Sequence, residues 1–126
     1  MLIQLPHPHP TPTAITLHKQ SRQLEITFDD GENYFLPFEF LRVHSPSAEV
    51  RGHGPGQEVL QIGKQNVALL DVRSVGSYAL KLIFDDGHDS GLYTWAYLHQ
   101  LGKHQQVLWQ EYLGKLEEAG ECREMK

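Results

Sequence analysis

The chain contains one strand-and-turn pattern twice, and this repetition constrains its fold more than any other feature. Leu24 to Gly31 reads LEITFDDG, and 56 residues later Leu80 to Gly87 reads LKLIFDDG. Apolar residues alternate along both copies, as they do in half-buried strands. Aspartate bonds to the backbone two residues on, and glycine accepts a positive φ, so Asp-Asp-Gly suits a strand reversal. The pattern predicts two strands that each end in a tight turn.

The remaining periodicity predicts further strands over residues 14–19, 34–37 and 67–77, and helices over residues 37–45, 95–101 and 105–119. Thr94 and Gly102 are the expected N-cap and C′ residues of the middle helix. The last helix should bury a stripe of Leu108, Tyr112 and Leu116, widened by Val107 and Leu113. Residues 45–57, rich in glycine and proline, should form an irregular loop.

These elements predict an α+β fold, with a mostly antiparallel sheet, short helices and a C-terminal helix. The 126 residues, 40% of them apolar, suffice for a single core. We expect a flexible arm rich in proline and histidine over residues 1–13, one domain over 14–119 and a disordered tail over 120–126.

Composition excludes several classes of function. The net charge is −5 and the basic residues are scattered, so nucleic acid is not an expected partner. The single cysteine, Cys122, excludes an internal disulfide and a cysteine-rich metal cage. Without a long apolar segment or a leader, no membrane association is expected, and the expected compartment is the cytoplasm. The oligomeric state is left open.

The second turn differs from the first because it carries a histidine. Asp85, Asp86 and His88 lie around Gly87, and paired carboxylates can perform acid/base chemistry or hold a divalent cation. His88 could also form a zinc or iron site with His44 or His53, which lie in predicted loops. The structural alternative is that the aspartates serve only the turn.

Two stretches carry a resemblance to a known family. LPFEFLRVHSPSAEVRGHG (residues 36–54) and GSYALKLIFDDGHDSGLYTWAYLHQLG (residues 76–102) resemble the γ-butyrobetaine-hydroxylase-like N-terminal domain, which occurs in small stand-alone bacterial proteins and in front of the catalytic domain of the hydroxylases. The resemblance implies a β-rich module with short helices and a structural zinc, separate from the catalytic iron. It therefore implies no catalysis by this chain alone.

The family's zinc ligands are mostly replaced here. Its three cysteine positions fall on Ser45, Ser47 and Val50, and its histidine falls on His88. Serine hydroxyls are poor zinc ligands and valine is none, so the thiolate site cannot form. We expect both serines to cap a short turn and His88 to bond to a backbone carbonyl or to that turn. His44, next to the first lost cysteine, leaves an altered metal site open.

The resemblance favours a non-catalytic accessory or protein-interaction domain. Its occurrence as an appendage of Mrp-type P-loop ATPases implies a link to metal-cofactor or iron-sulfur assembly. An exposed surface that includes Tyr93 and Tyr97 would bind an unidentified protein partner. The alternatives are a zinc- or iron-binding protein that uses His88 with His44 or His53, and an enzyme that uses Asp85, Asp86 and His88.

Overall fold

The computed structural model describes residues 10–52, 54 and 56–124, which form two antiparallel sheets of three strands each. The strands are β1 (Pro12–His18), β2 (Gln23–Phe28), β3 (Asn33–Pro37), β4 (Leu69–Val75), β5 (Ala79–Phe84) and β6 (Leu92–Thr94). The helices are α1 (Phe38–Val43), α2 (Ala48–Arg51), α3 (Trp95–Lys103) and α4 (Gln105–Ala119). The predicted α+β class is confirmed, with the strands divided between two sheets.

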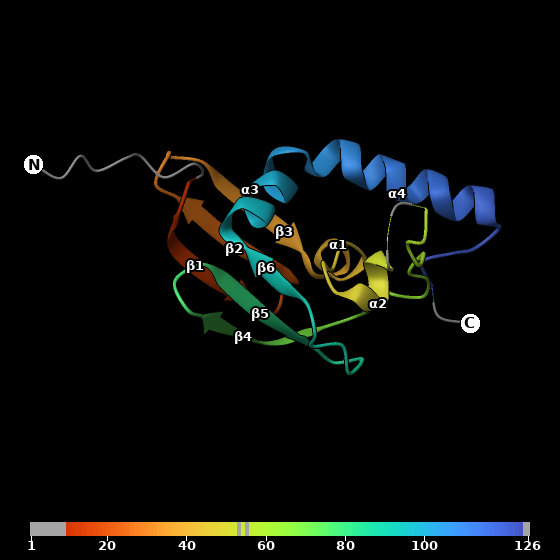
Figure 1. Ribbon diagram of the computed structural model, residues 1–126, viewed down its shortest axis with the longest axis horizontal. Helices are drawn as coiled ribbons and strands as arrows, with labels where there is room; N and C mark the ends of the chain where they lie inside the picture. Colours follow the sequence, from red (N-terminus) through yellow and green to blue (C-terminus); the bar gives the residue numbers. More distant parts are fainter. Residues whose placement is uncertain (1–9, 53, 55, 125–126) are drawn as a thin grey trace, which may run out of the picture.

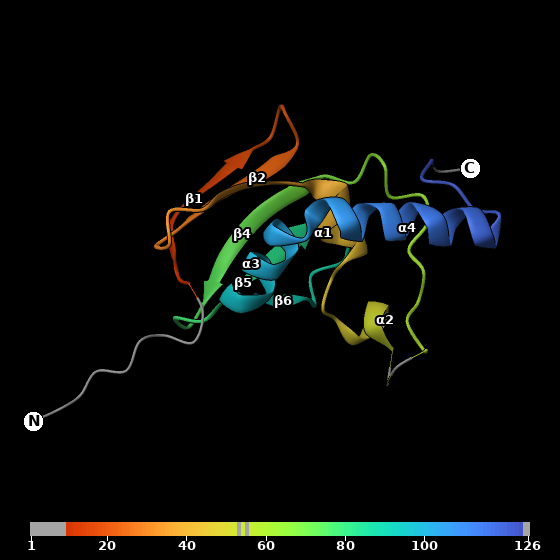
Figure 2. The ribbon, with the colours of Figure 1, turned by 90° about the horizontal axis from the view of Figure 1, so that it is seen from above.

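The sheets lie together at one end of the molecule, and α4 runs along one side and extends beyond them (Figure 1). The strand orders are β1-β2-β3 and β4-β5-β6. The central strand of each sheet, β2 or β5, is therefore the one that is followed by Asp-Asp-Gly. Seen from above, α1 lies beside α4 and α2 is set apart from it (Figure 2).

The two central strands supply much of the core. Every second side chain is buried, because successive residues of a strand point to opposite faces. These side chains are Leu24, Ile26 and Phe28 on β2, and Leu80, Leu82 and Phe84 on β5. Burying one such side chain contributes about 1.5–3 kcal/mol. A smaller cluster of Val43, Tyr112 and Leu116 fixes α4 to the end of α1.

The two Asp-Asp-Gly turns share two internal hydrogen bonds. In each, the last Phe of the strand donates its N–H to the carbonyl four residues on, and that residue donates its own N–H to the second aspartate. The bonds are Phe28 to Glu32 O (2.8 Å), Phe84 to His88 O (3.1 Å), Glu32 to Asp30 Oδ1 (2.9 Å) and His88 to Asp86 Oδ1 (3.2 Å). Gly31 and Gly87 have φ of 87° and 85°, as such turns require. The repeat in sequence is a repeat in structure.

The first aspartate of each turn fixes the residue that precedes the partner strand. Asp29 donates its N–H to Thr11 O (2.9 Å) and accepts from Thr11 N–H (3.1 Å). Asp85 makes the same pair of bonds with Ala68, at 2.9 and 3.0 Å. Both aspartates therefore close the end of a strand pair.

The second aspartate of each turn contacts the helix that follows the other sheet. Asp30 Oδ2 lies 2.9 Å from His99 Nε2 on α3, and Asp86 Oδ2 lies 2.8 Å from Arg42 Nε on α1. Because α1 follows the first sheet and α3 follows the second, the two contacts are reciprocal. Each half of the chain thus holds a helix of the other half.

The region expected to be an irregular loop, residues 45–57, contains the helix α2. Ser47 caps this helix, since its Oγ accepts the N–H of Glu49 (3.2 Å). The glycine and proline content predicted the loop, but the serine-cap signal before Ala48 decides the local structure. Residues 53 and 55 lie outside the described residues.

The two chain ends also differ from expectation. Residues 1–9 of the expected arm lie outside the described residues, but Pro12 and Thr13 already belong to β1. In the tail expected to be disordered, Arg123 makes a bidentate ion pair with Glu39 (2.7 and 2.9 Å) and lies over the Trp109 ring. The backbone carbonyls of Cys122 and Arg123 also accept the N–H groups of Gly63 (3.2 Å) and Gln65 (3.0 Å). The segment is therefore placed against the domain by a charge pair and backbone bonds that apolar periodicity does not reveal.

Gly102 lies inside α3 and not at its C′ position. Its role is close packing, because a Cβ at this position would lie 2.3 Å from Cγ of Tyr34 on β3. The absence of a side chain lets α3 approach the first sheet. Thr94, in contrast, is the predicted N-cap, with its Oγ1 accepting the N–H of Tyr97 (3.1 Å).

We predict opposite effects for two glycine-to-alanine substitutions in helices. Gly102→Ala should lower the free energy of unfolding by about 1–3 kcal/mol, because the new methyl group meets the Tyr34 ring. Gly114→Ala on α4, with no atom within 4 Å of its Cβ position, should raise it by about 0.5–1 kcal/mol. Urea denaturation of both variants measures the difference; equal changes would contradict the close-packing role.

Candidate functional site

Asp86 in the second turn organises the polar side chains around it. Its Oδ2 accepts from Arg42 Nε (2.8 Å) and from Lys64 Nζ (2.6 Å). Burial by itself would raise the pKa of Asp86, but the hydrogen bonds from Lys64, the His88 N–H and Arg42 lower it to about 2. The carboxylate is charged and fully engaged, so it is poorly suited to act as a general acid or base.

His88 connects the second turn to α2. One ring nitrogen, Nε2, lies 2.7 Å from Ser45 Oγ, and the other, Nδ1, lies 3.0 Å from Glu49 Oε2. Because the carboxylate can only accept, Nδ1 carries the proton and Nε2 accepts from the Ser45 hydroxyl. The His88 side chain is 3% exposed. We call these three residues, Ser45, Glu49 and His88, the imidazole clamp.

The serine turn, which we define as residues 45–47 before α2, is also held by side-chain hydrogen bonds. Ser45 Oγ accepts the N–H of Ser47 (3.3 Å), and Ser47 Oγ lies 2.7 Å from Ser90 Oγ. Val50 is buried, and its carbonyl accepts the N–H of Val59 (2.7 Å). The positions that match the family's three cysteines are therefore all engaged. The two serines bond to His88 and Ser90, at and just after the second turn, and Val50 is buried.

The clamp has the atomic order of a serine-histidine-carboxylate triad, and its surroundings do not suit catalysis. In such a triad the hydroxyl must reach a substrate carbonyl beside oxyanion-stabilising donors. Ser45 is 1% exposed, and its Oγ would lie 2.4 Å from a Cβ placed on Gly91. The hydroxyl is thus buried against the chain and poorly placed to attack a substrate, although Ser45 borders the groove described below.

The residues at the family's zinc position do not fit zinc. The donor set is two hydroxyls and one imidazole whose nitrogens both have protein partners, and Val50 offers no donor. Across the described part of the chain, no group of three or more His, Cys, Asp or Glu side chains could hold a metal ion. His53 lies outside the described residues.

His44 does not join His88. Its Nδ1 donates to Phe40 O (2.9 Å), and its ring packs on Phe40 and Tyr112. Burial lowers the pKa of His44. The Phe40 carbonyl and Glu111 raise this pKa, but they offset the effect of burial only in part. His44 is therefore a neutral imidazole that faces α4.

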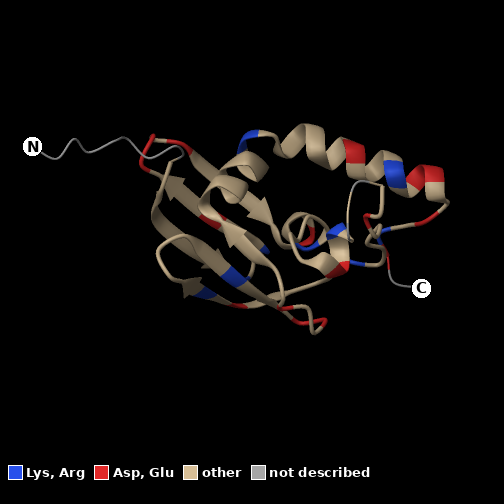
Figure 3. Ribbon diagram, viewed as in Figure 1, with Lys and Arg blue, Asp and Glu red and all other residues tan. Residues whose placement is uncertain are grey.

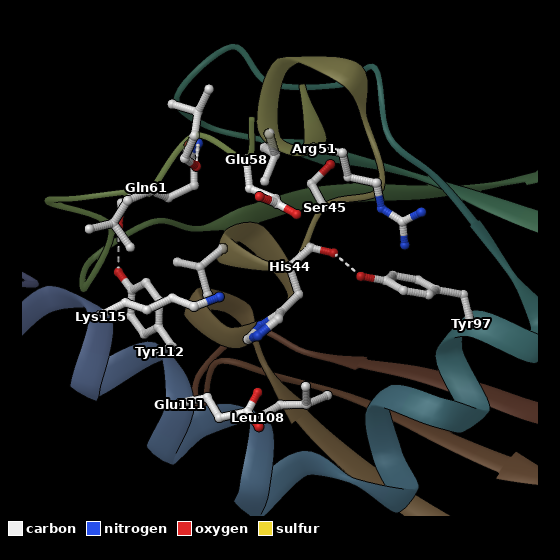
Figure 4. Close-up of a pocket in the computed structure, with 14 residues that line it drawn as sticks. His44, Ser45, Arg51, Glu58, Gln61, Tyr97, Leu108, Glu111, Tyr112 and Lys115 are labelled. Atoms are coloured by element: carbon white, nitrogen blue, oxygen red, sulfur yellow. Dashed lines mark hydrogen bonds between the residues drawn. The ribbon is translucent and has the colours of Figure 1, made fainter. Parts of the chain in front are cut away.

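A groove of about 320 Å³ lies on this side of His44 (Figure 4). Its walls are the end of α1, α2, residues 58–61, α3 and α4. Apolar and aromatic lining comes from Val43, Val50, Leu60, Leu108, Tyr97 and Tyr112, and charged lining comes from Arg51, Glu58, Glu111 and Lys115. The volume is at the lower end of the range for ligand pockets. Sequence reasoning missed this groove because its walls come from five separate segments.

Two tyrosine hydroxyls hold the groove walls together. Tyr97 Oη donates to His44 O and Tyr112 Oη donates to Gln61 O, each at 2.6 Å (Figure 4). Burial raises the pKa of Tyr112 to about 12, so its phenol stays protonated. The Arg51 guanidinium lies 4.9 Å from the centre of the Tyr97 ring. The groove is therefore a built feature of the fold.

The two tyrosines expected on an interaction surface have different positions. Tyr97 lines the groove and is half-buried. Tyr93 is fully buried, and its hydroxyl donates to Leu41 O (2.6 Å). Tyr93 is thus not a surface residue, because β6 packs its inward side chain into the core.

The fold and the site define a small α+β domain in which an imidazole clamp stands beside an apolar groove. Residues 15–99 match the family model described as gamma-butyrobetaine hydroxylase-like, N-terminal. The chain therefore belongs to this family, as its motifs predicted. No curated protein matches the chain.

Solved structures resemble the chain over most of its length. Two solution NMR structures have TM-scores of 0.80; one protein is 54% identical, with 92% of this chain and 91% of that chain covered, and the other is 47% identical, with 96% and 90% covered. A crystal structure from Acidithiobacillus ferrooxidans, of a protein of unknown function in the DUF971 family, is 37% identical, with a TM-score of 0.62 and coverage of 73% and 92%. These relatives support the family assignment and name no activity.

In the described part of the chain, no helix has both the length and the apolar character needed to cross a membrane.

We predict that acid destabilises the fold through the imidazoles of His44, which is half-buried, and His88, which is buried. Burial lowers the pKa of His44 and of His88 below the usual 6.5, and for His88 the nearby Arg42 lowers it further, against the effects of Glu49 and Asp86. Below about pH 6.5 the unfolded chain therefore binds more protons than the folded one, and the free energy of unfolding falls as pH falls. Asp86 should add a second fall below its usual 3.8, towards about 2.

Urea denaturation at several pH values measures this effect. The double variant His44→Gln/His88→Gln should show a smaller fall between about pH 7 and about pH 5 than the unmodified chain. A free energy of unfolding that stays constant or rises on acidification would contradict the assigned environment of both imidazoles.

Proposed function

We propose that this protein is a non-catalytic accessory domain that binds another protein through the groove. The groove is the observation that carries the proposal. It offers apolar side chains and an aromatic wall, it is open to solvent, and its shape is fixed by hydrogen bonds between elements far apart in sequence.

The state of the polar groups supports a binding role over catalysis. Asp86 is engaged by two cations, and both nitrogens of His88 have protein partners. Asp85 bonds to the backbone of Ala68. Since every group of the Asp85, Asp86 and His88 cluster has a structural partner, that cluster offers no general acid or base to a substrate.

The link to metal-cofactor or iron-sulfur assembly stays a prediction from the family resemblance. In this proposal the groove would hold a protein of that machinery, and the chain would not hold the metal itself. The cytoplasmic location, which was predicted from the sequence composition, also stays a prediction.

Two exposed valines provide a matched test. Val59 lines the groove and is 53% exposed, while Val107 on α4 is 60% exposed and does not line it. Val59→Arg should abolish binding by placing a charge in the groove mouth, and Val107→Arg should not. The measurement is quantitative affinity capture from cells that produce the protein, with the full chain and both variants as baits.

A protein captured by the unmodified chain and by Val107→Arg, and lost with Val59→Arg, is the expected result. A set of captured proteins that does not change with Val59→Arg would contradict binding through the groove. Circular dichroism melting of both variants checks that each is folded.

A further inference from the structure

Residues 122–124, which we call the tail segment, place an arginine against the domain. Arg123 donates from Nε and Nη2 to the two carboxylate oxygens of Glu39, at 2.9 and 2.7 Å. Its guanidinium carbon lies 5.2 Å from the centre of the Trp109 ring. Charged residues of both signs gather where the chain returns from α4 towards α1 (Figure 3). We call Glu39 and Trp109 the arginine socket.

The two walls of the arginine socket are held without the help of the tail segment. Glu39 lies in the first turn of α1, and its side chain is 8% exposed. The Trp109 ring on α4 contacts the rings of Phe40 and Tyr112, at centroid distances of 6.4 and 5.3 Å. Both walls therefore belong to the packed helices, and the tail segment supplies only the occupant.

The chemistry of the arginine socket selects a guanidinium group. Among the described residues, Arg123 alone bonds to the Glu39 carboxylate. A buried carboxylate without a counter-charge is costly, so the socket requires a cation. A planar guanidinium can direct two N–H groups at both carboxylate oxygens and still lie over an aromatic ring, which the point charge of a lysine does not match. The socket therefore fits arginine better than lysine.

The tail segment is attached to the domain by polar contacts. Besides the ion pair, its backbone carbonyls at Cys122 and Arg123 accept the N–H groups of Gly63 (3.2 Å) and Gln65 (3.0 Å). Cys122 is exposed, and no side chain of the tail segment belongs to either core cluster. Local opening costs least where few apolar contacts are lost. The tail segment can therefore leave the arginine socket while the core stays intact.

From these features we propose that the arginine socket binds an arginine side chain of a partner protein, and that Arg123 occupies the socket until the partner displaces the tail segment. This inference rests on the protein-binding role proposed above. The site is separate from the groove, whose lining includes neither Glu39 nor Trp109. Arg123 acts as an internal competitor, so only a partner that presents a well-placed arginine releases the tail segment.

The first test measures whether the tail segment opens in the unmodified chain. In native-state hydrogen exchange, the amides of Gly63 and Gln65 should exchange about tenfold or more faster than the amide of Ile26 in β2, because the contacts of the tail segment protect them. Arg123→Ala should raise both rates further. Exchange of Gly63 and Gln65 only at the rate of Ile26 would show that the tail segment never leaves, and it would overturn the proposal.

The second test measures which side chain the arginine socket takes. The Arg123→Ala chain is titrated with N-acetylarginine amide, and the indole resonance of Trp109 and the melting temperature are followed. The probe should shift this resonance saturably and raise the melting temperature, because it restores a counter-charge to Glu39. The unmodified chain should bind the probe about tenfold or more weakly, because its socket is occupied.

Two controls make the second test specific. N-acetyllysine amide should bind the Arg123→Ala chain at least about fivefold more weakly than the arginine probe, and equal binding would overturn the ligand class. Glu39→Gln/Arg123→Ala keeps the Trp109 ring and lacks the carboxylate, so an indole shift that persists in this variant would overturn the site. If melting shows that Arg123→Ala is unfolded, Arg123→Lys takes its place with the same expected ranking of the probes.

The capture experiment described above connects the arginine socket to a partner. A protein that is captured through the groove should be captured more strongly by Arg123→Ala than by Glu39→Gln/Arg123→Ala, and equal capture would overturn the role of the socket in partner binding. The two proposals fail separately. Loss of the probe response leaves binding through the groove intact, while an unchanged capture with Val59→Arg leaves the probe response of the socket intact.

Discussion

The buried imidazole of His88 is the interaction on which the arrangement of the site depends. It joins the second Asp-Asp-Gly turn to Ser45 and to Glu49 at the start of α2. A helix of four residues has too few internal hydrogen bonds to be stable alone. Its position depends on these outside contacts, on the Ser47 cap and on buried Val50. Since α2 is one wall of the groove, the clamp also fixes the shape of the groove.

A comparison of the two halves of the chain explains why the histidine after Gly87 can position α2. The two turns share two internal hydrogen bonds, and in each the second aspartate contacts the helix of the other half. Glu32 occupies the equivalent position of the first turn and is exposed. Only the second turn faces the serine turn before α2, so only there is the side chain after glycine buried. The first Asp-Asp-Gly turn therefore has only a structural role, while the second also positions α2 beside the candidate site.

Much of the scaffold was predictable from sequence because it depends on local patterns. Alternation and Asp-Asp-Gly predicted both central strands and their turns, and Thr94 was correctly predicted as an N-cap. The errors have non-local causes. Val107, expected to widen the buried stripe of α4, is exposed because α4 packs towards α1 through Tyr112 and Leu116. The groove, the orientation of His44 and the Arg123 ion pair depend on segments that meet only in the folded chain.

Hydrogen bonds to a neutral His88 thus stand where the family resemblance implies a metal ligand set. The most direct measurement is imidazole ¹⁵N NMR of the full chain near neutral pH, before and after addition of zinc. We expect His88 to carry its proton on Nδ1, with Nε2 unprotonated, and zinc to leave both resonances unchanged. A proton on Nε2, or saturable zinc-induced shifts of the His88 nitrogens, would contradict it.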